Sequence, residues 1–107
     1  LGSNVLIAEV KDSKCYDTVV ISKAADAMLA MSGIEASFVL AKNTQGFISI
    51  SARSRSKLNV QRIMEELGGG GHFNLAAAQI KDLTLSEAGE KLTEIVLNEI
   101  KEKEKEE

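Results

Sequence analysis

The sequence predicts a single α/β domain in which a mixed sheet of about four strands packs against three helices. Short apolar runs rich in β-branched residues, typical of buried strands, alternate with longer stretches whose apolar residues recur at helical spacing. Size and composition agree with this class. A chain of 107 residues with 44% hydrophobic and 27% charged residues is one globular domain with one core.

The first half of the chain predicts a strand, a helix and a hairpin, in this order. Residues 5–10 form the first apolar run. Asp17 precedes a helical stripe that Gly33 ends, which gives a helix near residues 17–32. Residues 36–41 and 47–52 are two strands joined by a link of hairpin type, and serines occupy one face of the second strand.

The second half is expected to contain two more helices. Asn59 can cap a short helix that runs to Leu67. Residues 75–78 are expected to form a turn of helix, and residues 79–81 a short strand. A last helix begins at Ser86, and residues 101–107 form a charged tail at its end. Residues 1–3 resemble a cloning remnant and are left out of the fold.

Composition argues against several classes of function. No apolar run approaches the roughly 20 residues that cross a bilayer, so we expect a cytoplasmic domain that does not itself span a membrane. Cys15 is alone, which excludes an internal disulfide. One histidine and scattered acids offer neither a metal cluster nor a nucleophilic triad, so the domain is expected to bind and not to cleave. The net charge of −3 is unlike that of a surface coating duplex nucleic acid.

A glycine run is the most informative local feature, and it comprises Gly68, Gly69, Gly70 and Gly71, followed by His72. A helix needs one or two glycines to end. Each further glycine costs about 0.5–1 kcal/mol relative to alanine where the native backbone does not require it. Because adjacent N–H groups in a concave nest commonly hold an anion, we expect this run to bind an anionic ligand. A flexible hinge and a structural histidine are the alternatives.

A second candidate group ends the strand that precedes this run. Arg53 can bind a phosphate with two parallel hydrogen bonds, and Ser51 and Ser54 can add hydroxyl donors. Phe73 is the aromatic residue expected beside the ligand. Between residues 36 and 64 there are five basic residues and no acid, which is consistent with an anionic ligand. An ordinary solvated arginine on a basic surface is the alternative.

The order of Ser-Ala-Arg-Ser at 51–54, Asn-Val-Gln at 59–61 and Gly-Gly-Gly-Gly-His at 68–72 resembles the DHH-associated domain (DHHA type 1) of DHH-family phosphoesterases. The resemblance covers nearly the whole chain. In the residues of these motifs, the chain is similar to membrane-anchored phosphodiesterases that open cyclic di-AMP to linear pApA. Nuclease-like relatives carry Ala-x-Gly soon after the histidine, where this chain has the different sequence of residues 75–79.

The resemblance implies a longer parent protein in which one domain carries out catalysis and this domain binds the substrate. An upstream DHH catalytic domain would supply a two-metal centre, with Mn²⁺ expected there and no cofactor expected in this chain. This domain would bind a cyclic dinucleotide or a short oligonucleotide. Arg53 and the backbone of residues 68–71 would hold phosphate or base, and His72 would face the scissile phosphate. The parent would be anchored in the membrane with this domain in the cytosol.

Three functions stay open at this point. The first is the substrate-binding half of a cyclic-di-AMP phosphodiesterase, and the second is the matching half of an oligoribonuclease or pAp phosphatase. The third is a non-catalytic nucleic-acid-binding module, against which the acidic net charge and the scarcity of aromatic residues argue. A homodimer is compatible with all three.

Overall fold

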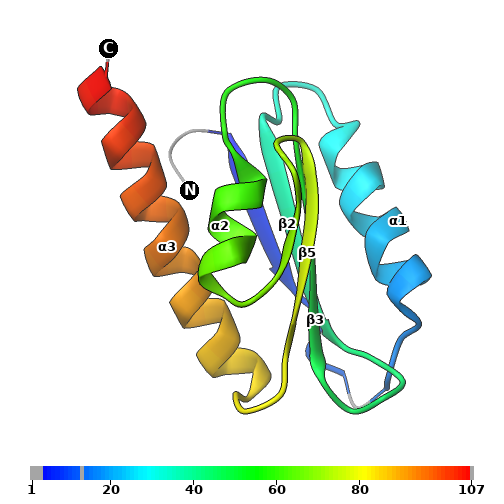
Figure 1. The fold of residues 1–107 in the computed structure, drawn as a ribbon. Coiled ribbons are helices and arrows are strands. Elements are labelled where there is room, and N and C mark those ends of the chain that lie inside the picture. Colours follow the sequence, from blue (N-terminus) through cyan, green and yellow to red (C-terminus); the bar gives the residue numbers. More distant parts are fainter. Residues whose placement is uncertain (1–3, 13, 107) are drawn as a thin grey trace.

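The computed structural model describes residues 4–12 and 14–106, and Figure 1 shows its fold. The elements are β1 (Val5–Glu9), α1 (Thr18–Leu29), β2 (Ala36–Lys42), β3 (Ile48–Ser54), α2 (Val60–Glu66), β4 (Gly70–His72), β5 (Leu75–Ile80) and α3 (Leu85–Glu106). The predicted α/β class is confirmed, with three helices and a sheet of five strands in the described part of the chain. The predicted cloning remnant lies outside the described residues.

The strands form one mixed sheet in the order β1-β2-β3-β5-β4. β1 runs parallel to β2, and the other neighbours are antiparallel. α1 lies on one face of the sheet, and α2 and α3 lie on the other (Figure 1). Because α1 packs on β2 and β3, the same face of β5 and β4 stays uncovered.

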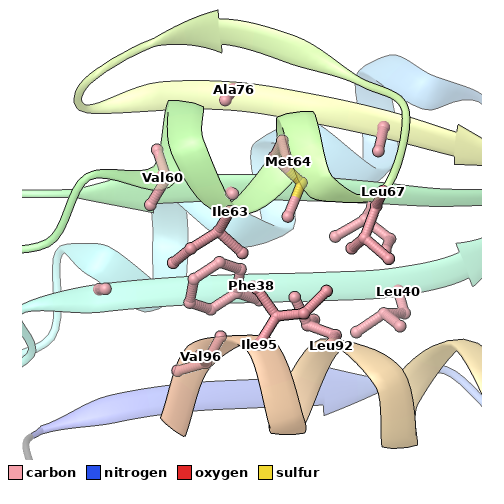
Figure 2. Close-up of a cluster of buried hydrophobic side chains, with 14 of the residues drawn as sticks. Phe38, Leu40, Val60, Ile63, Met64, Leu67, Ala76, Leu92, Ile95 and Val96 are labelled. Carbon is pink, nitrogen blue, oxygen red and sulfur yellow. The ribbon is translucent and has the colours of Figure 1, made fainter. Parts of the chain in front are cut away.

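Two apolar clusters fix the helices to the sheet. The larger cluster lies between the sheet and the helices α2 and α3, where the fully buried Phe38 contacts neighbours from both helices, among them Ile63 and Val96 (Figure 2). The smaller cluster joins Ile21 of α1 to Val39 of β2. Alternating residues of β2 therefore face opposite layers, as a strand buried on both sides requires.

The expected turn of helix at residues 75–78 is wrong, because these residues belong to β5. Ala76 and Ala78 are buried in the larger cluster, while Leu75 and Ala77 are exposed on the other face. Alanine favours helices, but pairing with β3 on one edge and β4 on the other decides the conformation here. An alanine run also carries no alternation of polarity from which a strand could be predicted.

Candidate functional site

Strand register brings the predicted arginine and histidine to the same face of the sheet. Arg53 of β3 pairs with Leu75 of β5, and Leu75 pairs with His72 of β4. Residues directly opposite each other in antiparallel strands project to the same side, so these three form one row across the sheet. Ser51, Ala77 and Gly70 form the next such row, about 7 Å further along the strands.

We call this surface the open face, because its half over β5 and β4 is not covered by α1. It consists of Ser51, Arg53, Gly70, His72, Leu75, Ala77 and Gln79.

Arg53 is held in one orientation by two internal hydrogen bonds. Its Nε donates to Asp26 Oδ1 of α1 at 2.7 Å, and its Nη1 donates to the Ala52 carbonyl oxygen at 2.9 Å. The side chain of Arg53 is 9% exposed, whereas that of Asp26 is 61% exposed. Every buried polar side-chain atom in the described ranges has a partner, and Nη2 has none there, so Nη2 reaches the surface. One nitrogen of the guanidinium is therefore available to a ligand.

The two serines around Arg53 have structural partners. Ser51 is 3% exposed, and its hydroxyl lies 3.1 Å from that of Ser22 on α1. Ser54 points to the opposite face of β3 and donates its hydroxyl to the Phe73 carbonyl oxygen at 3.2 Å. The structure thus places both predicted hydroxyl donors inside the fold, where they hold α1 and the turn after β4.

The glycine run does not form the expected concave nest. Gly68 and Gly69 end α2, because their N–H groups donate to the carbonyl oxygens of Glu65 and Met64. The next two glycines, with His72, form the edge strand β4. A helix end followed by an edge strand replaces the single anion cradle that the sequence suggested.

Three of the four glycines are required by the fold itself. Gly68 has a φ of +85° at the end of α2, a conformation that favours glycine. A Cβ on Gly69 would lie 2.1 Å from the Ala77 carbonyl oxygen. A Cβ on Gly71 would lie 2.5 Å from Ala76 Cα, and the φ of Gly71 is +146°.

Gly70 is the exception within the run. Its φ is not positive, and a Cβ built on it would meet no atom within 4 Å. It pairs with Ala77, so its missing side chain would project over the open face. A glycine in a strand without an internal reason indicates a place where a ligand or another backbone approaches closely.

The side chain of Phe73 does not lie on the open face that carries His72. His72 is exposed, and its side chain makes no hydrogen bond with the described residues. Phe73, 38% exposed, lines a hollow of about 130 Å³ beside α2 and α3, together with Lys57, Arg62 and Glu99. The aromatic ring that the sequence assigned to the ligand therefore lies away from the open face.

Three residues of the site escaped the sequence analysis. Asp26 fixes Arg53, Leu75 lies between Arg53 and His72, and Gln79 continues the same face of β5. The position of Asp26 could have been inferred from the sequence, because Asp26 lies four residues after Ser22 and the two polar side chains therefore share one face of the helix. Leu75 carried no such signal, because residues 75–78 were expected to form a turn of helix, and Gln79 was expected in a short strand at 79–81 but without a role in the site.

The described ranges show neither a metal-binding cluster nor a membrane-spanning helix. There, no group of three or more His, Cys, Asp or Glu residues is arranged to hold a metal ion, so these residues do not fit a two-metal centre. No helix in residues 4–12 and 14–106 is both long and apolar enough to cross a bilayer.

Ahead of α1, the Tyr16 hydroxyl donates to Asp12 at 2.5 Å, which lowers the pKa of that carboxyl and raises the pKa of Tyr16.

Residues 2–104 match the family model of the DHHA1 domain, and the chain belongs to this family.

Two curated relatives are cyclic-di-AMP phosphodiesterases. GdpP of Geobacillus thermodenitrificans is 47% identical over 92 residues, which are 86% of this chain and 14% of the relative. PdeA of Listeria monocytogenes is 49% identical over 86 residues, which are 80% of this chain and 13% of the relative. The matched part is thus about a seventh of each relative's length. The bifunctional oligoribonuclease and PAP phosphatase NrnA of Thermus thermophilus is 40% identical over 68 residues, 64% of this chain and 21% of the relative.

Solved structures share the fold. An exopolyphosphatase-related protein from Bacteroides fragilis superposes with a TM-score of 0.56 at 28% identity, over 69% of this chain and 21% of that chain. A pGpG-specific phosphodiesterase from Vibrio cholerae superposes with a TM-score of 0.57 at 19% identity, over 89% of this chain and 34% of that chain. The family model and the curated relatives place the chain among DHHA1 domains that occur in cyclic-di-AMP phosphodiesterases and NrnA-like phosphoesterases.

Proposed function

We propose that this chain is the substrate-binding domain of a phosphodiesterase that hydrolyses cyclic di-AMP to linear pApA, and that the open face binds the substrate. The observation that carries the proposal is Gly70, the glycine that the fold does not require, next to the row of Arg53, Leu75 and His72. The identity of 47–49% with two cyclic-di-AMP phosphodiesterases supports this choice of substrate.

Arg53, His72 and Gly70 of the open face each have a defined role in this proposal. Arg53 donates a hydrogen bond from Nη2 to a phosphate oxygen while Asp26 keeps the guanidinium in place. His72 donates a hydrogen bond from its imidazole to the scissile phosphate. Gly70 lets the ligand approach the main chain of β4. The domain thereby positions the substrate and stabilises its charge.

The chemistry of hydrolysis belongs to another part of the parent protein. We place a two-metal centre with Mn²⁺ in a preceding DHH domain of the parent, and the length of two relatives, of which the matched part is 13–14%, is consistent with such a further domain. In the same proposal the parent is membrane-anchored and this domain lies in the cytosol.

A second candidate function is the matching domain of an oligoribonuclease or pAp phosphatase. The NrnA relative, 40% identical over 68 residues, favours it. Rates of hydrolysis of cyclic di-AMP and of a linear dinucleotide by the intact parent would separate the two. A faster reaction with the linear dinucleotide would select the second candidate.

The decisive variant is Arg53→Ala. We expect the chain to bind cyclic di-AMP and pApA, with NMR shifts centred on residues 51–54 and 70–72. Arg53→Ala should weaken that binding about ten- to hundredfold, because it removes a charge-assisted hydrogen bond to phosphate. The same amide spectra report whether the variant remains folded.

Arg62→Ala provides the matched control. Arg62 is a 62% exposed cation that pairs with Glu99 of α3 on the side of the sheet opposite the open face. Its removal changes the net charge equally, so a nonspecific charge effect would appear in both variants. Equal affinities of Arg53→Ala and the unmodified chain, or shifts centred on Arg62, would contradict the proposed function.

A further inference from the structure

Building on the proposed function, we propose that the outward side of β5 binds the nucleobase of the substrate and selects adenine. We call the three residues concerned, Leu75, Ala77 and Gln79, the base platform. In this arrangement the ring lies on Leu75 and Ala77, and the side-chain amide of Gln79 reads its edge.

The first argument is an exposed apolar surface inside a polar site. Leu75 is 51% exposed although it lies between Arg53 and His72 in one cross-strand row. Ala77 follows two residues later on the same face, and Gly70 beside it adds no side chain. The result is a low apolar floor next to the phosphate-binding groups. Apolar side chains are a usual support for the flat face of a base.

The second argument is the free amide at the end of this floor. Gln79 is exposed, and its side chain has no hydrogen-bond partner among the described residues. It borders a polar hollow of about 180 Å³ that also includes Asp17 and Asn43. The hollow leaves room for the edge of a ring beside the amide.

The third argument is the direction in which a bound nucleotide would lie along β5. Four residues separate Leu75 from Gln79, and this distance along a strand is about 13 Å. The row of Arg53 and His72 lies at the Leu75 end of the platform. A nucleotide aligned with β5 therefore has its phosphate near Arg53 and its base edge near Gln79.

The chemistry of the amide favours adenine. A carboxamide presents one donor and one acceptor side by side, which complements N7 and N6 of adenine. At the corresponding edge of guanine, N7 and O6 are both acceptors, so the oxygen of Gln79 would face another acceptor. The base platform thus predicts a preference for adenine over guanine.

The test compares affinities of this chain for cyclic di-AMP and cyclic di-GMP. We expect the unmodified chain to bind the adenine compound more tightly, and Gln79→Ala to weaken that binding about tenfold. Binding of cyclic di-GMP should hardly change, so the preference disappears. Gln61→Ala, which removes a half-buried amide on α2 that donates to Glu65 Oε2 at 3.4 Å, should leave both affinities unchanged.

Leu75→Ser tests the apolar floor. It should weaken the binding of both dinucleotides to a similar extent, because the floor contacts the ring face and not its edge. Affinity for inorganic pyrophosphate, which has no base, should stay as it is.

The outcomes separate the two proposals. If Gln79→Ala keeps the preference for adenine while Arg53→Ala loses affinity, the base platform is wrong and the proposed function stands. If the unmodified chain binds neither dinucleotide, both are overturned. NMR shifts over Leu75 that depend on protein concentration and not on ligand would instead assign this surface to contact between copies of the chain, which also overturns the platform.

Discussion

At the scale of single residues, the glycine run shows that one sequence motif can serve several purposes. Gly68 ends a helix, Gly69 and Gly71 let β4 approach β5, and Gly70 does none of these. Conformational need and ligand access can therefore be separated by substitution, which the sequence alone did not allow.

We predict that Gly70→Ala keeps the fold and loses the ligand. A Cβ at this position meets open space, so the free energy of unfolding should change by no more than about 1 kcal/mol. The added methyl group would project over the open face and should weaken the binding of cyclic di-AMP. Urea unfolding and NMR titration of the same sample would measure the two effects.

Gly71→Ala is the matching variant for this pair. Its φ of +146° and the 2.5 Å approach of a Cβ to Ala76 Cα should cost at least about 1–3 kcal/mol of stability. Equal losses of stability in the two variants would show that Gly70 also has a structural role.

At the scale of elements, Asn43 organises the connection between β2 and β3. The residue is 1% exposed, and its side chain donates to Ser49 Oγ at 2.8 Å. Its Oδ1 accepts from the N–H groups of Gln45 and Phe47 at 2.9 and 3.1 Å. One buried amide thus fixes the turn that sets the register of Arg53.

Asn43→Ala should reduce the free energy of unfolding by about 1–3 kcal/mol, because it leaves buried polar groups without a partner. Chemical denaturation monitored by circular dichroism measures the loss. Thr44→Ala, an exposed neighbour without a hydrogen bond to the described residues, should stay close to the unmodified chain. A neutral effect of Asn43→Ala would mean that the hairpin forms without this amide.

Most elements could be predicted from the sequence because their local signals agree with their final state. The apolar runs at 36–41 and 47–52 became β2 and β3, and Asn59 caps α2 as expected, with its side chain accepting from Arg62 N–H. β4 could not be predicted, and β5 was predicted only at its end by the short strand at 79–81, because glycine and alanine have little strand propensity and acquire it from pairing.

The candidate site could be predicted only in part for the same reason. Arg53 and His72 were identified by type and position in the chain, but their common face depends on the register of β5. The serines were assigned to a ligand although they were needed for packing, and an isolated sequence does not distinguish the two uses of a hydroxyl.

At the scale of the whole molecule, helices cover the sheet unequally. α2 and α3 close one face over the larger apolar cluster, while α1 covers only part of the other (Figure 1). Under the proposed function, ligand contact and the larger apolar cluster fall on different sides of one sheet, so a change on one side need not disturb the other.

Phe38→Ala should destabilise the domain by about 3–5 kcal/mol, because Phe38 is fully buried between the sheet and two helices (Figure 2). A domain of this size has a total stability of about 5–15 kcal/mol, so the variant should melt at a much lower temperature. Scanning calorimetry measures the shift. Val19→Ala, which removes a 57% exposed side chain of α1, should change it little. Similar melting points for the two variants would contradict the assignment of the core.

The contact between Asp26 and Arg53 has a consequence for how discriminating this domain can be. Arginine carries about 2 kcal/mol of rotamer entropy when it is free, and the contact with α1 removes much of this freedom in advance. The carboxylate also offsets the charge of Arg53, so under the proposed function attraction at long range would contribute little. A ligand of the proposed site would be recognised mainly by its shape and by the direction of the donor once it has arrived.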